Sequence, residues 1–439
     1  MAAEELAANQ RAAGPATDPV ARDVARWATA RQLTPVAMAA IALGFGVIAA
    51  VWLTAVSMRS GAIAFIALLF AFVAGRAGRL MGASESDAVT DWGVAACAVL
   101  TELAVYAGIA GSASVNAASA GLTGPAGTRL RGTSLASFGG PGAGGVWRLA
   151  VAALIALALV EMASFCVAAA GPDATPSRFE VFVGAPGGPR LLLIGVAVLV
   201  AGARVTFLLL LALGGLALIA ILVRGSGAAA GQEAEAPGPG APADGDPAQQ
   251  LRWLPGCRGD GPVAVWIGRF VAGRLPPLPP LLVGLLVTGM LVALGLQNLP
   301  GILVLTPVEA MMLAALTSWH AHDGRRDWLA PPLLQAGEYV YIAAAGFAGR
   351  VWPPVTLALL AAVVLRHQEL AYWSRGRPAR RPHPDRRALG WEGRMIVVGI
   401  AATGGVLKVG YPLLAVYLWA VLAWEFTVGW SAGHAAVDG

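Results

Sequence analysis

The chain reads Ala71-Phe-Val-Ala74-Gly75-Arg76-Ala77-Gly78-Arg79 and, eight residues further on, Asp87-Ala-Val-Thr-Asp91. Asp87 and Asp91 are four residues apart and therefore share one face of a helix. Glu102 follows eleven residues later and extends this face by about three turns. Carboxylates on a helix inside a bilayer are costly and normally face a polar cavity or a partner. The two stretches therefore predict a polar site between two membrane helices.

A purely structural role is the alternative for this acidic pair. Acidic residues near the N-terminus of a helix are stabilised by the helix macrodipole. Asp87 is also of a residue type that caps helices. The spacing alone leaves both interpretations open.

The composition is that of a membrane protein. Hydrophobic residues make up 57% of the chain and charged residues only 13%, and the mean hydropathy is +0.68. A helix that spans a bilayer needs about 20 mostly apolar residues, and the chain contains many such runs. Residues 1–34 are polar, so we expect a cytoplasmic N-terminal tail and no secretory signal.

The apolar runs predict an all-α polytopic membrane protein with two bundles of about six helices each. The first bundle occupies 35–224, with spans at 35–56, 61–74, 88–110, 149–170, 191–203 and 205–223. The second occupies 276–434, with spans at 281–296, 302–318, 328–348, 352–365, 395–407 and 411–429. Residues 225–275 are rich in Gly, Pro and Ala, which is typical of a flexible linker. The fifth and sixth spans are separated at Gly202-Ala203-Arg204 because a buried arginine at mid-depth is costly.

The charges predict the topology. Cytoplasmic loops carry an excess of Lys and Arg, and the arginine-rich segment 366–394 lies on the same side as Arg76, Arg79 and the linker if the N-terminus is cytoplasmic. We therefore expect a multi-pass protein of the inner (cytoplasmic) membrane with both termini in the cytoplasm. The pI of about 9.5 fits basic loops near anionic lipid, and we expect no nucleic-acid partner.

The two opening stretches resemble the signature of the CDP-alcohol phosphotransferase family, DxxDGxxAR followed downstream by GxxxDxxxD. Ala71 and Ala74 stand where the first two aspartates belong, whereas Gly75, Arg79 and the downstream aspartates remain. The resemblance covers most of 18–224. It includes the Leu-Thr-Pro step that ends at Pro35, the segment from Glu102 to Gly108, and the break at Gly202-Ala203-Arg204.

The resemblance implies roles for individual residues. In active members, four aspartates hold divalent metal, the metal binds the CDP diphosphate, and the last aspartate removes the proton of the alcohol. By position, Asp91 is that catalytic base, and Asp87 and Asp91 are metal ligands. The implied substrate-binding residues are Gly75, Arg76, Arg79 and Glu102, where a small residue permits close backbone approach and a guanidinium pairs with phosphate.

The sequence departs from the family pattern in ways that bear on activity. Ala71 and Ala74 cannot bind metal, Gly78 replaces the motif alanine, and the interval from Arg79 to Asp87 is about five residues shorter than the family's. Because Mg²⁺ often uses one or two carboxylates plus substrate phosphates, one residual Mg²⁺ or Mn²⁺ is conceivable, but a two-metal clamp is not. We expect impaired or lost transfer of a phosphatidyl or phospho-alcohol group in phospholipid metabolism.

Two other hypotheses remain. In the first, the scaffold is a non-catalytic membrane partner that binds lipid, nucleotide or a related active subunit. In general we expect membrane lipid as the partner, with CDP-diacylglycerol or another CDP-alcohol as the candidate ligand, and a homodimer like the active relatives. A transporter ranks last, because the halves show no internal repeat and no paired broken helices.

The sequence of the second half gives weaker indications of a functional site. His320-Ala-His322-Asp323-Gly324 through Trp328 is interpreted as a charged turn rather than a metal site, and the arginine-rich segment as a solvated topology anchor. Segments across 280–430 resemble an uncharacterised membrane domain often fused behind CDP-alcohol phosphotransferases. Glu309, Glu338 and Glu425 are candidates for an internal polar site.

Overall fold

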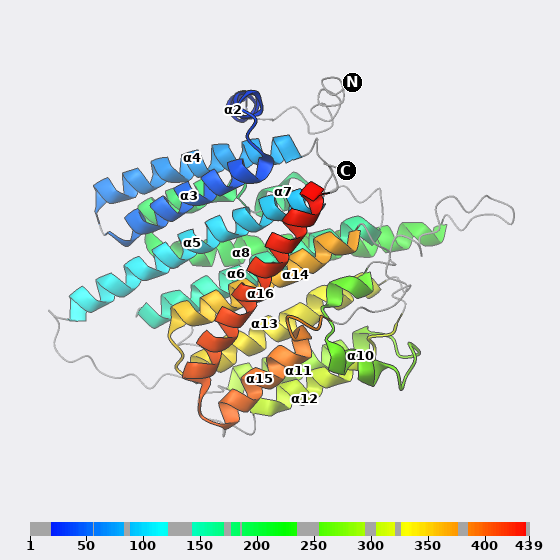
Figure 1. Ribbon diagram of the computed structural model, residues 1–439. Coiled ribbons are helices and arrows are strands. Elements are labelled where there is room, and N and C mark those ends of the chain that lie inside the picture. The colour runs from blue at the N-terminus through cyan, green and yellow to red at the C-terminus, as the bar shows by residue number, and fades with distance from the viewer. Residues whose placement is uncertain are drawn as a thin grey trace, which may run out of the picture.

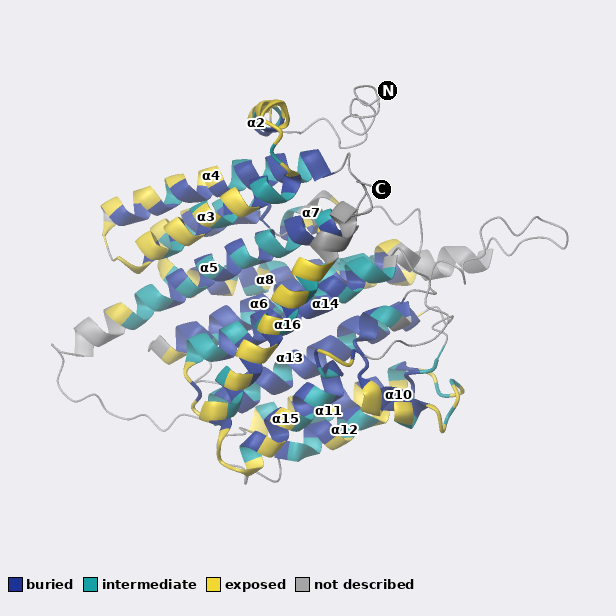
Figure 2. Cartoon of the chain, in the orientation of Figure 1, coloured by how far each residue is buried: buried dark blue, intermediate teal, exposed yellow. Residues whose placement is uncertain are grey.

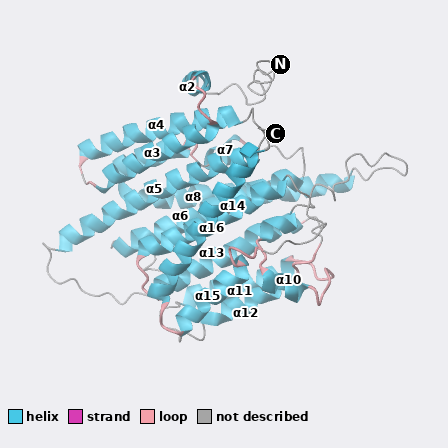
Figure 3. Ribbon diagram, in the orientation of Figure 1, coloured by secondary structure: helices cyan, strands magenta, loops and turns pink. Residues whose placement is uncertain are grey.

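Apolar runs become helices here because a helix satisfies all of its own backbone hydrogen bonds, which a bilayer interior requires. The computed structural model describes residues 19–55, 57–82, 88–121, 143–170, 177–184, 187–234, 254–294, 304–320, 326–375 and 385–435. Every regular element within these ranges is a helix (Figure 3). The predicted all-α class is confirmed for this part of the chain.

Seven helices lie in the described ranges of the first half. They are α2 (Pro19–Ala30), α3 (Pro35–Thr54), α4 (Met58–Gly82), α5 (Ala88–Gly121), α6 (Ala143–Ala170), the short α7 (Arg178–Gly184) and α8 (Arg190–Ala234). Thr34 caps α3, because its side-chain oxygen accepts a hydrogen bond from the N–H of Ala37, and Pro35 supplies a helical φ at the first position. The backbone of α8 breaks at Gly202, where φ is 78°, so the predicted interruption at this residue is confirmed.

The second half begins with a short helical turn, η1 (Leu254–Arg258), and α10 (Pro262–Gly268). The longer elements follow: α11 (Leu278–Leu294), α12 (Thr306–Ala315), η4 (Asp327–Leu329), α13 (Ala330–Ala348), α14 (Pro353–Arg375), α15 (Gly390–Thr403) and α16 (Leu407–Ala435).

Seven of the described helices are long and apolar enough to cross a membrane: α3, α4, α5, α6, α8, α14 and α16. The helices found at three other predicted spans are shorter, with 17 residues in α11, 10 in α12 and 14 in α15. α13 has 19 residues but is not among the seven, and the fifth and sixth predicted spans both lie in α8. The membrane class therefore holds, whereas the count of twelve crossings stays a prediction.

The helices pack as one continuous bundle in which α6 and α14 lie at the centre. Figure 1 shows α3, α4 and α5 on one side and α11, α12 and α15 on the other. α6 contacts α8, α13 and α14, and α5 contacts α14 and α16. The two halves thus share a core. Exposed apolar side chains lie on the outer helices such as α3, α4 and α16, while α13 and α14 are mostly buried (Figure 2).

Two segments expected to be irregular are partly folded. Within the predicted tail 1–34, α2 packs on α4 through Ala21, Ala25 and Ala28, and Figure 1 shows it across the end of the bundle. Within the predicted linker 225–275, α8 continues to Ala234, and η1 and α10 pack on the second half. The correction has a physical reason, since apolar contacts and a buried ion pair described below stabilise these segments.

Candidate functional site

The two alanines of the predicted site are buried in helix packing. Ala71 is 1% exposed and Ala74 is 6% exposed. Ala74 belongs to a small apolar cluster of α2, α3 and α4, where it packs with Met38 and Met81. At Gly78, an added Cβ would lie 3.0 Å from the carbonyl oxygen of Pro35. The positions where the resemblance predicts two carboxylates are therefore occupied by small apolar side chains in helix packing.

A cavity of about 10 Å³ remains beside these alanines, which is the room of about one water molecule. Its lining includes Ala71, Gly75, Arg79, Thr101 and Gly187. A Cβ added at Gly75 would meet only the Cβ of Ala42, at 3.6 Å, so this glycine is not needed for a close backbone approach between helices.

Arg79 is the predicted substrate-binding residue that reaches this cavity. Its Nη2 donates a hydrogen bond to the carbonyl oxygen of Gly187 at 3.0 Å. Arg76 lies one turn earlier on the same helix, and both side chains are half-buried. The predicted neighbours Gly75 and Arg79 thus lie together, and Arg76 is adjacent at the end of α4.

The two acidic residues of the prediction that the structure describes, Asp91 and Glu102, lie apart. Asp91 lies in the first turn of α5 and is exposed. Asp87 lies outside the described residues. Glu102 lies about 16 Å further along α5, at 1.5 Å per residue, and is buried.

Glu102 makes contacts other than those expected of a substrate-binding residue. Its carboxylate accepts hydrogen bonds from the N–H of Gly187 at 2.7 Å and from Nε of Arg190 at 2.8 Å, and Nη2 of Arg190 forms a second contact. Both partners are buried. Two parallel bonds of this kind make an arginine–carboxylate contact strong.

A hydrogen-bonded chain continues from this pair into the second half of the protein. Nη2 of Arg190 also lies 3.2 Å from Glu161 Oε1 on α6. The other Glu161 oxygen accepts a hydrogen bond from Gln368 on α14. The chain Arg79–Gly187–Glu102–Arg190–Glu161–Gln368 therefore connects the predicted site to the centre of the bundle.

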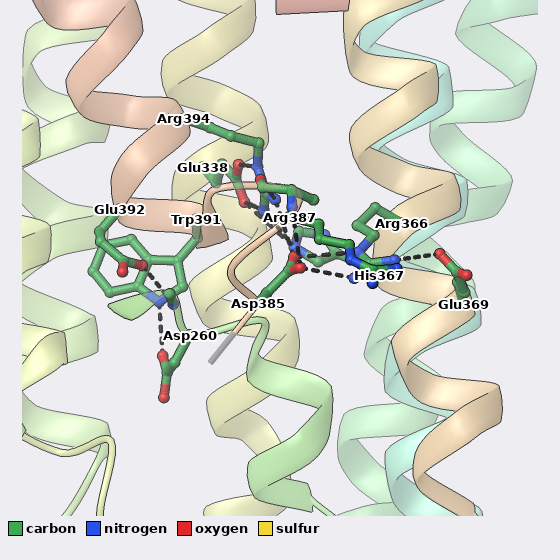
Figure 4. Close-up of polar contacts among 12 residues, drawn as sticks. Asp260, Glu338, Arg366, His367, Glu369, Asp385, Arg387, Trp391, Glu392 and Arg394 are labelled. Carbon is green, nitrogen blue, oxygen red and sulfur yellow. Dashed lines mark hydrogen bonds and ion pairs between the residues drawn. The ribbon is translucent and has the colours of Figure 1, made fainter. Parts of the chain in front are cut away.

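The segment around Gln368 directs polar side chains to several neighbours. His367 Nδ1 lies 2.7 Å from the Tyr339 hydroxyl on α13. Arg366 contacts Glu369, Asp385 and Glu425, with the Asp385 contact at 2.7 Å. Figure 4 shows Arg366 between Asp385 and Glu369.

Arg394 on α15 forms the most buried ion pair of the second half. Its Nε lies 2.6 Å from Glu338 Oε1 and its Nη2 lies 3.0 Å from Glu338 Oε2, and neither side chain is exposed. Nη1 donates to the carbonyl oxygen of Ala388 at 3.0 Å. Figure 4 shows this pair beside the loop that carries Asp385.

A third group ties the folded part of the predicted linker to α15. Arg258 Nε lies 2.9 Å from Asp260 Oδ2. Trp391 Nε1 donates to Asp260 Oδ1 at 2.7 Å, as Figure 4 shows. Glu392 accepts hydrogen bonds from the N–H groups of Gly261 and Ala264 at 2.9 and 3.1 Å. These contacts explain why the linker prediction was wrong around residues 254–268.

Two interpretations of the second half change with these contacts. Arg366 and Arg394 are buried and ion-paired, so the segment 366–394 is not simply a solvated anchor, although Arg386 and Arg387 are exposed. Glu338 and Glu425 do belong to an internal polar network, whereas Glu309 is exposed on α12.

In the predicted charged turn, His320 Nδ1 lies 3.4 Å from Asp327, and His322 and Asp323 lie outside the described residues.

Sequence reasoning missed three central members of the network: Glu161, Arg190 and Gln368. A signal for Glu161 was present, because it is an acidic residue inside the apolar run 149–170. In the ranges that the structure describes, no group of three or more His, Cys, Asp or Glu residues is arranged to hold a metal ion.

The helices and their buried charge network define an all-helical protein suited to a membrane. Residues 249–438 match the profile of a Family of unknown function (DUF5941). The matched region includes every residue labelled in Figure 4. No curated protein matches the chain, and no solved structure matches it.

The pH dependence of stability is predicted to involve Glu392, which lies outside the apolar spans. Burial, and then the nearby Asp260 carboxylate, raises the pKa of Glu392 to about 7. A raised pKa means that the folded state binds a proton more readily than the unfolded chain does. The stabilisation is therefore complete at low pH and is lost as the pH rises through about 7.

We expect the free energy of unfolding of the wild-type protein, relative to that of Glu392→Gln, to fall by on the order of 2 kcal/mol between about pH 5 and pH 8. The melting temperature of the wild type should fall relative to that of the variant over the same range. Thermal unfolding of both proteins at several pH values measures this difference. A difference that is constant with pH, or that grows as the pH rises, contradicts the prediction.

Proposed function

We propose that the chain is a CDP-alcohol phosphotransferase-like membrane protein of phospholipid metabolism that binds a phosphate-bearing lipid or nucleotide without transferring it. The ligand is CDP-diacylglycerol or another CDP-alcohol, and its phosphates pair with Arg76 and Arg79. The proposal includes a homodimer in the inner membrane, with both termini in the cytoplasm and about twelve crossings.

The proposal is supported by the side chains at the two positions where the resemblance predicts aspartates. Ala71 and Ala74 are buried against neighbouring helices, and the cavity beside them holds about 10 Å³. Glu102 is neutralised by Arg190. Two half-buried guanidinium groups thus lie at the end of α4 with only Asp91 as a described acidic residue of the motif, which favours an anionic ligand.

The residues present do not fit the metal centre that the resemblance implies. A two-metal clamp needs several anionic ligands, and two of the implied positions are apolar alanines in close packing. We therefore derive no step through a metal ion, and the proposed activity is binding.

Calorimetry of the purified full-length protein in lipid nanodiscs tests the proposal. CDP-diacylglycerol should bind with the same affinity with and without Mg²⁺ or Mn²⁺, and no CMP should be released in the presence of alcohol acceptors. Binding that requires metal, accompanied by CMP release, would show an active transferase. Absence of binding under both conditions would refute the proposed ligand.

Arg79→Gln is predicted to weaken this binding about tenfold, because a charge-assisted hydrogen bond contributes about 1.5 kcal/mol or more. Arg59→Gln is the matched control, since Arg59 is an exposed arginine near the opposite end of α4. Equal effects of the two substitutions would contradict a specific role for Arg79. Melting temperatures of both variants establish that each one is folded.

A further inference from the structure

A second cavity lies between the two halves of the protein and is distinct from the predicted phosphate site. It measures about 250 Å³. For comparison, an engineered apolar protein cavity of about 150 Å³ binds benzene. The lining comes from α5, α6 and α14 and from the end of α7. It therefore has room for a ligand somewhat larger than one aromatic ring.

The polar groups that line this cavity are hydrogen-bond acceptors or can act as acceptors. They are the carboxylate of Glu161, the amide of Gln368 and the hydroxyls of Ser164 and Tyr372. The rings of Phe165 and Tyr372 form part of the wall, with their centroids 6.3 Å apart in an edge-to-face arrangement. Among the lining residues that the structure describes, there is no Lys, Arg or His. Such a lining favours a cation and disfavours a phosphate or a carboxylate.

Glu161 is the less strongly paired carboxylate of its cluster. Arg190 directs two nitrogen atoms at Glu102 but approaches Glu161 with one, at 3.2 Å. Two carboxylates share this one guanidinium. An additional positive charge on the cavity side of Glu161 would therefore be stabilised by a carboxylate that Arg190 neutralises only in part.

Gln368 supplies a second independent observation. Its amide nitrogen donates to Glu161, whereas its Oε1 is buried and accepts no hydrogen bond from the described residues. A buried acceptor without a donor is unfavourable by about 1–3 kcal/mol. A ligand N–H in the cavity would supply a donor of the kind this oxygen lacks.

We propose that this cavity binds a small organic ammonium ion with an apolar body. The ammonium group donates to Glu161 and to Gln368 Oε1. The rings of Phe165 and Tyr372 are placed to interact with the cation, and Met162 and Ala371 contact its apolar part. The site selects a charge opposite to that of the phosphate ligand proposed above, so either proposal can fail without the other.

Binding of three probes of similar shape to the full-length protein in nanodiscs tests the charge preference. The probes are 2-phenylethylammonium, 2-phenylethanol and phenylacetate, with empty nanodiscs as the reference for partitioning into lipid. Calorimetry should show the ammonium ion binding at least about tenfold more tightly than the alcohol, which corresponds to about 1.4 kcal/mol. Phenylacetate should bind more weakly than the alcohol.

Two variants locate the binding. Glu161→Gln should reduce ammonium affinity about tenfold and leave alcohol affinity nearly unchanged. Ala168→Trp fills the cavity from an exposed lining position and should abolish binding of both probes. Ala40→Trp, at an exposed position of α3, is the matched control and should bind like the wild type.

Melting temperatures establish that each variant is folded, and Ala168→Trp keeps the proposal testable if Glu161→Gln unfolds. Three results would each overturn the proposal. These are equal affinity for the ammonium and carboxylate probes, ammonium binding that survives Ala168→Trp, and absence of ammonium binding to the folded wild-type protein.

Discussion

Arg394→Met is expected to destabilise the protein by about 3–5 kcal/mol, the usual effect of removing one member of a buried ion pair. Arg394 and Glu338 are both 0% exposed, and two nitrogen–oxygen contacts of 2.6 and 3.0 Å join them. Without the guanidinium, the Glu338 carboxylate would remain buried without its main partner. The melting temperature of the full-length protein in nanodiscs measures the loss.

Arg387→Met is the matched control for this prediction. Arg387 is 64% exposed and lies 3.8 Å from Glu425, so its loss should change stability by no more than about 1 kcal/mol. The double variant Arg394→Met with Glu338→Leu should recover much of the lost stability, because replacing both members of a buried pair by apolar groups is often neutral. If Arg394→Met is as mild as Arg387→Met, the buried pair does not stabilise the fold.

Gly108→Ala is expected to lower stability by about 1–3 kcal/mol, as overpacking of a tight interface does. A Cβ at Gly108 on α5 would lie 2.5 Å from the carbonyl oxygen of Ala50 and 2.7 Å from its Cα on α3. These are backbone atoms that cannot rotate away, so the two helices would have to separate. Because α3 and α5 both line the cavity beside Arg79, that separation would also disturb the predicted phosphate site.

Gly44→Ala is expected to change stability in the opposite direction, as a gain. An added Cβ at Gly44 on α3 would meet no atom within 4 Å, and alanine is favoured over glycine in a helix by about 1 kcal/mol. Thermal unfolding should therefore show a gain for Gly44→Ala and a loss for Gly108→Ala. A gain in stability at both positions would show that helix propensity, and not the contact between α3 and α5, controls the outcome.

Several elements could be predicted because their causes are local. The runs that became α3, α5 and α6 are long, apolar and nearly free of charge, and in a bilayer such runs form helices. The break in α8 was also predicted, because a buried arginine at Arg204 would be costly in one continuous span. The backbone breaks at Gly202, where φ is 78°, a value that glycine tolerates far better than other residues. The finer count of crossings depends on α11, α12 and α15, which are short. It depends also on α13, which is not among the seven candidate spans, and on whether α8 crosses once or twice.

The candidate sites were harder to predict because their members are distant in sequence. Glu102 was expected to face a substrate, yet it pairs with Arg190, which lies 88 positions later. Arg394 was assigned to a solvated segment, yet it pairs with Glu338, 56 positions earlier. A charged residue inside an apolar run indicates that the residue has a polar partner, but the sequence of the run does not identify that partner.

The amino-acid sequence by itself determined that this protein is helical and suited to a membrane, because backbone hydrogen bonding and the length of apolar runs are local properties. It also places Ala71 and Ala74 at the two positions where the resemblance predicts aspartates. Only the tertiary structure decided that α3 packs against those alanines, that Arg190 holds Glu102 and Glu161, and that α14 joins the two halves through Gln368. The physical reason is that a buried charge is stabilised by whichever opposite charge the packing of helices brings within a few ångströms, and sequence separation places no limit on that choice.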